Sequence, residues 1–169
     1  MSISRLRCLS LLAAPLPILI QQQAPPALAR IAIRSVATGK GIGVPGKGAD
    51  LEAVQQYGAK DPKAKMWTFK SLSGADKGYY EIHLDGTEAC LDVQGGAKDD
   101  SSPIIVFRCA GVDNQKWRMI RLTNCTVLLE AKHSGKVLDV PGGSSEDGVQ
   151  LIQYARNDGT NQQWRLCDQ

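Results

Sequence analysis

The chain has 169 residues and a formal net charge of +3, with 43% hydrophobic and 22% charged residues. This length favours one domain, and the composition is ordinary for a globular protein. The charge is too small to indicate nucleic acid or an anionic membrane surface as a partner, and no nucleic-acid-binding motif occurs. No apolar run reaches the roughly 18–20 residues that span a bilayer, so we expect no membrane span.

The N-terminal segment has the pattern of a secretory signal peptide. Two arginines precede the apolar run Leu9–Ile20, and Ala27-Leu28-Ala29 then forms a small-x-small cleavage pattern. We therefore predict a signal peptide over residues 1–29, cleaved after Ala29, and a mature chain that is secreted or periplasmic. A disordered tail or an uncleaved anchor is the alternative, although the run is short for an anchor.

The mature part, residues 30–169, has short β-type runs. Ile31 and Ile33 alternate with other residues, and the same alternation returns in the segment Tyr80–Leu84. Alternation of this kind is typical of half-buried strands. No segment has a long apolar stripe at helical period. Short strands separated by glycine-containing turns predict an all-β domain.

The three tryptophans mark an internal repeat. Trp67, Trp117 and Trp164 lie fifty and forty-seven residues apart, and another aromatic residue stands ten positions before each of them. Regular spacing indicates repeated structural units, here of about 46 residues and four short strands each. Three units fill the mature chain, at about residues 30–74, 75–121 and 122–169. The preceding aromatics are Tyr57, Phe107 and Tyr154.

The second and third units agree in much more than their tryptophans. Cys90–Trp117 and Val137–Trp164 share the pattern LDV, two glycines, an aromatic and NQxW, whereas Gly41–Trp67 keeps only part of it. Three units are too few for a propeller, and a closed barrel with pseudo-threefold symmetry fits better. The tryptophans would then be equivalent core positions, each with its indole N–H bonded to a carbonyl.

The mature chain also has four cysteines, without a C-x-x-C pair. In an exported protein an even number suggests two disulfides, here with three alternative pairings. Neither a zinc site nor a redox pair is indicated. The cysteines are Cys90, Cys109, Cys125 and Cys167.

The pattern with its QKW and QQW triplets resembles the ricin-type β-trefoil lectin domain. The resemblance covers the whole mature chain and is strong in the second and third repeats but weak in the first. It implies a β-trefoil of three pseudo-symmetric four-stranded repeats. It also implies a disulfide between Cys90 and Cys109 and a second between Cys125 and Cys167.

Two recurring sets of residues suit a shallow sugar site. A carboxylate accepts charge-assisted hydrogen bonds from sugar hydroxyls, an amide both donates and accepts, and an aromatic face covers the C–H patch of the sugar. The resemblance implies galactose-like sugars at these positions, with the Gln of each triplet supporting the Asp. The sets are Asp92, Phe107, Asn114 and Gln115 in the second repeat, and Asp139, Tyr154, Asn161 and Gln162 in the third.

Each of these residues also has a structural explanation, because an Asp before a turn can cap it and an aromatic can belong to the core. The recurrence of the whole set favours ligand contact. The first repeat departs from the pattern: Gly43, Ala64 and Lys65 replace the Asp, Asn and Gln, and only Tyr57 is kept. We therefore expect no sugar site in the first repeat.

We rank the third repeat above the second as a sugar site. The second repeat has the apolar segment Ile104–Val106 before Phe107, whereas the third has Gln150 and Gln153 near Tyr154. The third site is therefore expected to be richer in hydrogen-bonding groups. Phe107 also lacks the hydroxyl of Tyr154.

Catalysis has little support in the sequence. His83 and His133 occupy unrelated positions of their repeats, and no nucleophile or metal-hydrolase motif occurs. No cofactor or oxygen-rich metal site is evident either. We expect a non-enzymatic protein that binds glycans with galactose-like or other hexose units. The alternatives are a targeting or interaction subunit of a multi-subunit toxin or secreted enzyme complex, with a protein partner, and a protease inhibitor on the same scaffold.

Overall fold

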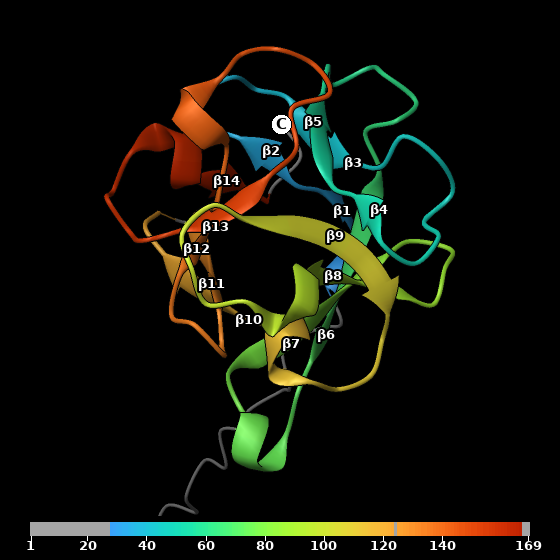
Figure 1. The fold of residues 1–169 in the computed structure, drawn as a ribbon, viewed down its shortest axis with the longest axis vertical. Helices are drawn as coiled ribbons and strands as arrows, with labels where there is room; N and C mark the ends of the chain where they lie inside the picture. The colour runs from blue at the N-terminus through green and yellow to red at the C-terminus, as the bar shows by residue number, and fades with distance from the viewer. Residues whose placement is uncertain (1–27, 124, 167–169) are drawn as a thin grey trace, which may run out of the picture.

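Six strand runs close into a barrel in the computed structural model, which describes residues 28–123 and 125–166 (Figure 1). Each run pairs antiparallel with the next, and the last pairs with the first. In ring order the runs are β1 (Leu28–Ala32) continued by β2 (Arg34–Ser35), β6 (Met66–Ser71), β7 (Tyr79–Leu84), β10 (Lys116–Arg121), β11 (Thr126–Ala131) and β14 (Trp164–Arg165).

Three antiparallel hairpins, one from each repeat, pair with one another beside the barrel strands. β4 (Glu52–Ala53) pairs with β9 (Ser102–Arg108), and β9 also pairs with β13 (Ile152–Tyr154). This arrangement is a β-trefoil, so the predicted fold is confirmed; β1 with β2, and β4 with β5, each count as one interrupted strand. The hairpins are β3 (Gly41–Gly43) with β5 (Gln55–Tyr57), β8 (Ala89–Val93) with β9 (Ser102–Arg108), and β12 (Val137–Asp139) with β13 (Ile152–Tyr154).

Single turns of 3-10 helix lie in the connections. The double glycines fall in two of them, where Gly95 and Gly142 have φ angles of 65° and 62°, a left-handed conformation that glycine adopts without steric cost. No helix of the described residues is long and apolar enough to span a membrane. The turns are η1 (Gly74–Asp76), η2 (Gln94–Gly96), η3 (Asp113–Gln115), η4 (Pro141–Gly143) and η5 (Thr160–Gln162).

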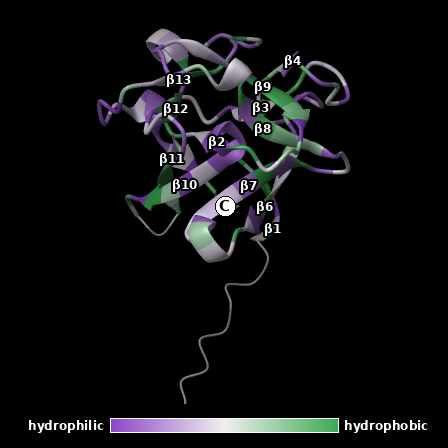
Figure 2. Ribbon diagram, turned by 60° about the horizontal axis from the view of Figure 1, so that its bottom comes forward, coloured by the Kyte–Doolittle hydropathy of each residue, from purple (hydrophilic) through white to green (hydrophobic). Residues whose placement is uncertain are grey.

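The three tryptophans occupy equivalent positions in the core, as predicted. All three side chains are fully buried. Their Nε1–H groups donate to the carbonyls of Ile42, Leu91 and Leu138, at N···O distances of 3.2, 2.9 and 3.1 Å. Hydrophobic residues concentrate in strands such as β8 and β9, and hydrophilic residues in the connecting loops (Figure 2).

The predicted disulfide between Cys90 and Cys109 is present and ties β8 to the residue that follows β9. The second predicted bridge includes Cys167, which lies outside the described residues. Most of the predicted signal peptide, residues 1–27, lies outside them as well. Strand β1 begins at Leu28, so the predicted cleavage after Ala29 falls within this strand.

Candidate functional site

In the second repeat, a buried carboxylate sits between two side-chain amides. Asp92 is the fourth residue of β8 and only 4% exposed. The Nδ2 atom of Asn114 donates to its Oδ1 at 3.0 Å, and the Nε2 atom of Gln115 donates to its Oδ2 at 2.8 Å. Gln115 is itself fixed, because its Oε1 accepts from the backbone N–H of Ala110 at 2.7 Å. The carboxylate is therefore held in one orientation.

The third repeat has the same arrangement. Asp139, at the end of β12, is 3% exposed. Asn161 and Gln162 both donate to its Oδ2, at 3.0 and 2.8 Å, and the Oε1 of Gln162 accepts from the backbone N–H of Asn157 at 2.9 Å. Since both amides bind Oδ2, Oδ1 keeps its capacity to accept hydrogen bonds.

The surroundings shift both carboxyl groups in the same direction. Burial raises the pKa of Asp92 and of Asp139 above the ordinary value of 3.8, because desolvation disfavours the ionised form. The amide hydrogen bonds from the neighbouring Gln and Asn oppose this shift and favour the carboxylate. Each Asp is thus a partly desolvated acceptor that fixed amide donors keep in place.

An open hollow lies over each of these carboxylates. The hollow of the second repeat has a volume of about 350 Å³ and includes Asp92, Phe107 and Asn114 in its lining. The hollow of the third repeat has about 320 Å³ and includes Asp139, Tyr154 and Asn161. The structure therefore brings together the predicted carboxylate, amide and aromatic of the second repeat, and likewise those of the third. Both glutamines are fully buried; Gln115 belongs to the lining of the first hollow, and Gln162 does not belong to that of the second.

The corresponding place in the first repeat is filled by the chain itself. Gly43 forms a bridge with Ala64, and a Cβ atom added to Gly43 would lie 1.8 Å from the backbone oxygen of Lys63. Tyr57, the retained aromatic, is only 4% exposed. With the segment at Lys63 in this position, a side chain at position 43 has no room.

The prediction that Gln150 and Gln153 enrich the third site is wrong. Gln153 is fully buried, and its Nε2 donates to the backbone oxygens of Ala97 and Asp99 at 2.8 and 3.0 Å. Gln150 donates to the backbone oxygen of Ile104 at 3.3 Å. Gln153 satisfies carbonyls of the loop before β9 and Gln150 a carbonyl within β9, and neither side chain belongs to the lining of the hollow.

A further position, which the sequence analysis missed, lines both hollows. Leu51 borders the hollow of the second repeat and Ser101 borders that of the third, and each comes from the repeat before. The sequence contains a signal for this position, because both residues stand sixteen positions before a tryptophan of the repeat pattern. Only the fold shows that the residue contacts the site of the following repeat.

A network of four charges fixes η3, which carries Asn114. The ammonium groups of Lys116 and Lys132 each contact both Asp76 and Asp113, at 2.6 to 3.0 Å. These contacts join η1, η3 and the turn after β11. Through Asp113 the network anchors the turn that carries the Asn–Gln pair of the second repeat.

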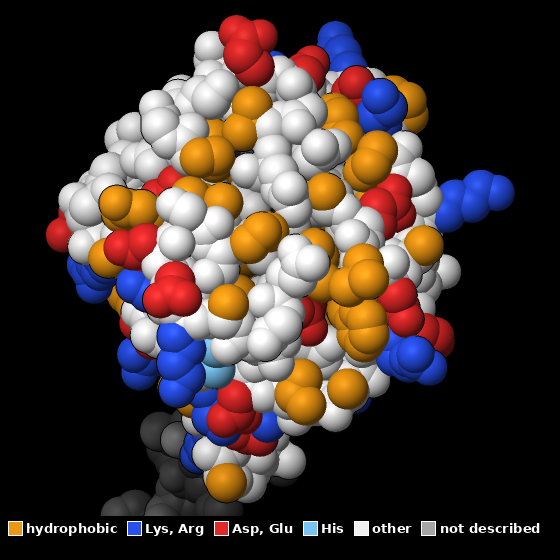
Figure 3. Space-filling view, viewed as in Figure 1, with side chains coloured by type: hydrophobic (Ala, Val, Ile, Leu, Met, Phe, Trp, Pro, Cys, Tyr) orange, Lys and Arg blue, Asp and Glu red, His pale blue; other side chains and the backbone are white. Residues whose placement is uncertain are grey.

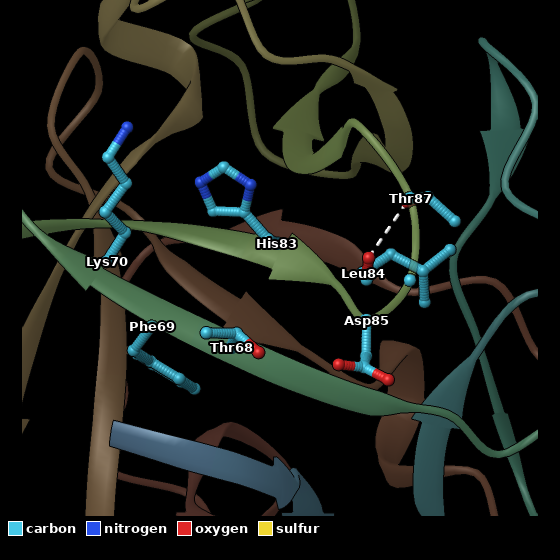
Figure 4. A pocket seen from close by; sticks show the side chains of 8 residues that line it. Thr68, Phe69, Lys70, His83, Leu84, Asp85 and Thr87 are labelled. Atoms are coloured by element: carbon cyan, nitrogen blue, oxygen red, sulfur yellow. Dashed lines mark hydrogen bonds between the residues drawn. The ribbon is translucent and has the colours of Figure 1, made fainter. Parts of the chain in front are cut away.

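A third hollow, of about 330 Å³, lies on the β6–β7 hairpin and differs in chemistry (Figure 4). Lys70 and His83 rise from neighbouring strands, while Asp85 at the turn points away from them. The Nδ1 atom of His83 lies 3.4 Å from the sulfur of Cys109. Because that sulfur is bonded to Cys90, the two cysteines offer no thiolate to a metal ion. This hollow has no carboxylate–amide pair like those above.

Comparison with protein families identifies one family over nearly the whole described chain. The family described as ricin-type beta-trefoil lectin domain matches residues 29–164. A comparison with curated proteins finds no match.

Comparison with solved structures finds β-trefoils. The chain is similar to a designed 3-fold symmetric protein, ThreeFoil, at 34% identity and a TM-score of 0.76, over 82% of this chain and 98% of that one. It is similar to 1,3Gal43A, an exo-β-1,3-galactanase from Clostridium thermocellum, at 26% identity and a TM-score of 0.77, over 85% of this chain and 31% of that one. A Polyporus squamosus lectin shares the fold at 21% identity and a TM-score of 0.68, over 83% of this chain and 49% of that one.

Proposed function

The chain belongs to the ricin-type β-trefoil lectin family, and we propose that it is a secreted protein that binds galactose-like sugars in its second and third repeats without catalysis. The observation that carries this proposal is the recurrence of one buried carboxylate held by two amides at equivalent places. Family membership supports carbohydrate binding in general. The two sites, the sugar and export are the proposal.

The geometry suits the recognition of neighbouring hydroxyl groups. A carboxylate accepts strong hydrogen bonds from hydroxyls, and Oδ1 of Asp139 keeps both of its lone pairs for them, since both amides bind Oδ2. The Nδ2 groups of Asn114 and Asn161 each donate one hydrogen bond to the site aspartate and one to a backbone carbonyl, so the side-chain oxygen of each amide is the group that can accept from a sugar hydroxyl. Phe107 and Tyr154 supply an apolar face for the C–H side of the sugar.

A shallow site for one sugar binds weakly, with a Kd of roughly 0.1–10 mM. Titration of the purified protein with methyl galactoside tests the proposal, with calorimetry or NMR as the readout. We expect two sites in the unchanged protein and one in each of the variants Asp92→Ala and Asp139→Ala. Asp61→Ala removes a carboxylate from the first repeat and is the matched control. Binding that survives the loss of both site aspartates in a folded protein would refute the assignment.

Export rests on the predicted signal peptide, residues 1–29. When the full chain is expressed in a secreting host, the mass of the exported protein should correspond to cleavage after Ala29. Retention of the intact chain inside the cell would contradict this part of the proposal.

A second candidate function is that of a targeting module for a separate or attached enzyme. The similarity to 31% of the length of an exo-β-1,3-galactanase supports this candidate, because a related module occurs there beside further sequence. Co-purification of the chain with a catalytic partner from its native source would distinguish the two candidates.

A further inference from the structure

In each repeat, the loop between the two hairpin strands contains one residue with a left-handed backbone. This residue contacts the hairpin of another repeat. The N–H groups of Leu51, Ser101 and Gly148 donate to the carbonyls of Val106, Gln153 and Gln56, at 3.0, 2.9 and 2.9 Å. Their φ angles are 69°, 64° and 78°. The three residues are therefore structurally equivalent. Leu51 lies over the second-repeat site, Ser101 over the third, and Gly148 over the filled place in the first.

Leu51 is an unusual residue for this position. A left-handed backbone disfavours residues other than glycine, asparagine and aspartate, and the side chain of Leu51 is 60% exposed. The loop is nevertheless fixed on both sides: the carboxylate of Asp50 accepts from the backbone N–H of Arg108 at 2.8 Å, and that of Glu52 accepts from Gly48 and Ala49 at 2.7 and 3.1 Å. The fold thus holds an apolar side chain in solvent at the rim of the site.

The remainder of the rim differs between the two sites in the same direction. The second-repeat hollow is bordered by Leu51 and by Val112, which is 45% exposed. Figure 3 shows hydrophobic side chains gathered on this face, on the right, beside the ends of β4 and β9. Four equivalent positions change from apolar in the second site to polar or small in the third: Leu51 to Ser101, Phe107 to Tyr154, Ala110 to Asn157 and Val112 to Gly159.

We propose that the second-repeat site selects sugars that carry an apolar aglycone and that Leu51 is the residue that contacts the aglycone. This inference rests on the function proposed above. The lining of this hollow combines the carboxylate and amide of Asp92 and Asn114 with the apolar side chains of Leu51 and Val112. A ligand that contacts the whole lining must therefore present hydroxyls to the polar groups and an alkyl or aryl group to the apolar ones. The third-repeat site, with Ser101 on its rim, has no such preference.

The apolar part of the lining disfavours other substituents. A free hydroxyl or an N-acetyl amide placed against Leu51 and Val112 would lose hydrogen bonds to water without gaining a side-chain partner there. An aryl or alkyl group loses nothing on leaving water and gains about 25 cal/mol for each Å² of buried apolar surface. Burial of about 50 Å² in this way corresponds to a roughly five- to tenfold gain in affinity.

The test compares methyl galactoside with phenyl galactoside, each as both anomers, in proteins that keep one site. Asp139→Ala leaves the second site, and Asp92→Ala leaves the third. In the first variant we expect phenyl galactoside to bind roughly five- to tenfold more tightly than methyl galactoside. In the second variant we expect equal affinities. Adding Leu51→Ser to the first variant should abolish the preference, and adding Ser101→Leu to the second should create one.

Leu51→Ser and Ser101→Leu are a matched pair of substitutions, because the two residues occupy equivalent positions with a left-handed backbone. Circular dichroism and melting temperatures establish that each variant is folded. Equal affinities for the two galactosides at the second site would overturn the inference while leaving sugar binding intact. A preference for phenyl galactoside that survives Leu51→Ser would overturn it too, and so would a preference of the second site for N-acetylgalactosamine. Failure of both single-site proteins to bind any galactoside would instead refute the proposed function on which the inference rests.

Discussion

At the scale of single residues, the proposed sugar binding depends on two buried carboxyl groups, which act as acceptors in their ionised form. Asp92 and Asp139 are raised in pKa above 3.8 by desolvation. Their ionised forms accept hydrogen bonds from hydroxyls, whereas a protonated carboxyl has lost much of that capacity. Sugar binding should therefore depend on pH in a range above the one in which ordinary aspartates titrate.

We predict that affinity falls as the pH decreases toward and below these raised pKa values, by up to about tenfold for each pH unit. The effect on stability has the opposite sign: a carboxyl whose pKa is higher in the folded state binds its proton more tightly there, so these two groups favour folding at low pH and lose that contribution as the pH rises. The loss of binding should thus precede acid unfolding. Titrations at pH values between 7 and 4, with unfolding followed in parallel, measure both. Affinity that stays constant down to pH 3.8 would contradict this prediction.

A second prediction at this scale concerns the first repeat. Gly43→Asp restores the sequence pattern, but we expect no new sugar site and a loss of about 1–3 kcal/mol of unfolding free energy from overpacking. The reason is that the added Cβ would lie 1.8 Å from the oxygen of Lys63. Gly58→Ala is the control, since its nearest neighbouring atom would lie 4.0 Å away. Denaturant unfolding compares the two, and equal stabilities would show that the segment at Lys63 moves aside.

At the scale of elements, the second-repeat site depends on the β8–β9 hairpin. Cys90 pairs with Phe107 across this hairpin, and Asp92 lies two residues further along β8. The disulfide between Cys90 and Cys109 therefore fixes the distance between the carboxylate strand and the aromatic strand. The third repeat holds its β12–β13 hairpin without a disulfide at the equivalent place, since Val137 and Arg156 stand where the cysteines would be.

The double substitution Cys90→Ser/Cys109→Ser should lower the unfolding free energy by about 2–4 kcal/mol, because the bridge restricts the unfolded chain. It should also weaken the second-repeat site more than the third. Calorimetric titration with methyl galactoside, in backgrounds that keep one site, separates the two effects. Equal weakening of both sites would mean that the disulfide supports the whole fold and not this hairpin in particular.

The elements were largely predictable from the sequence. The alternating residues Ile31, Ile33 and Ile82 are buried as expected, because alternation places one side of a strand in the core. The aspartate and amide sets were predictable because they recur at fixed distances from the tryptophans. The rim of the second-repeat site was not predictable, because Leu51 borders the site of the following repeat. The role of Gln153 was not predictable either, because its partners are carbonyls of a loop some fifty residues away in sequence.

At the scale of the whole molecule, the threefold repeat places equivalent surfaces around one core. The buried tryptophans bind equivalent carbonyls in the three repeats, and the same scaffold presents two open hollows and one filled place. Two weak sites on one molecule gain from ligands that carry several sugars, because the second contact forms at a high effective concentration. We therefore predict that the protein binds best to a surface dense in glycans.

We propose that the aspartates of the second and third repeats hold sugars, and binding of the purified protein to a broad glycan array tests this proposal most directly. The double variant Asp92→Ala/Asp139→Ala is tested beside it, with Asp61→Ala as the control and with circular dichroism to establish folding. We expect selective binding to galactose-containing glycans by the unchanged protein and the control, and none by the double variant. Binding retained by the folded double variant, or absent from all three proteins, would contradict the proposal.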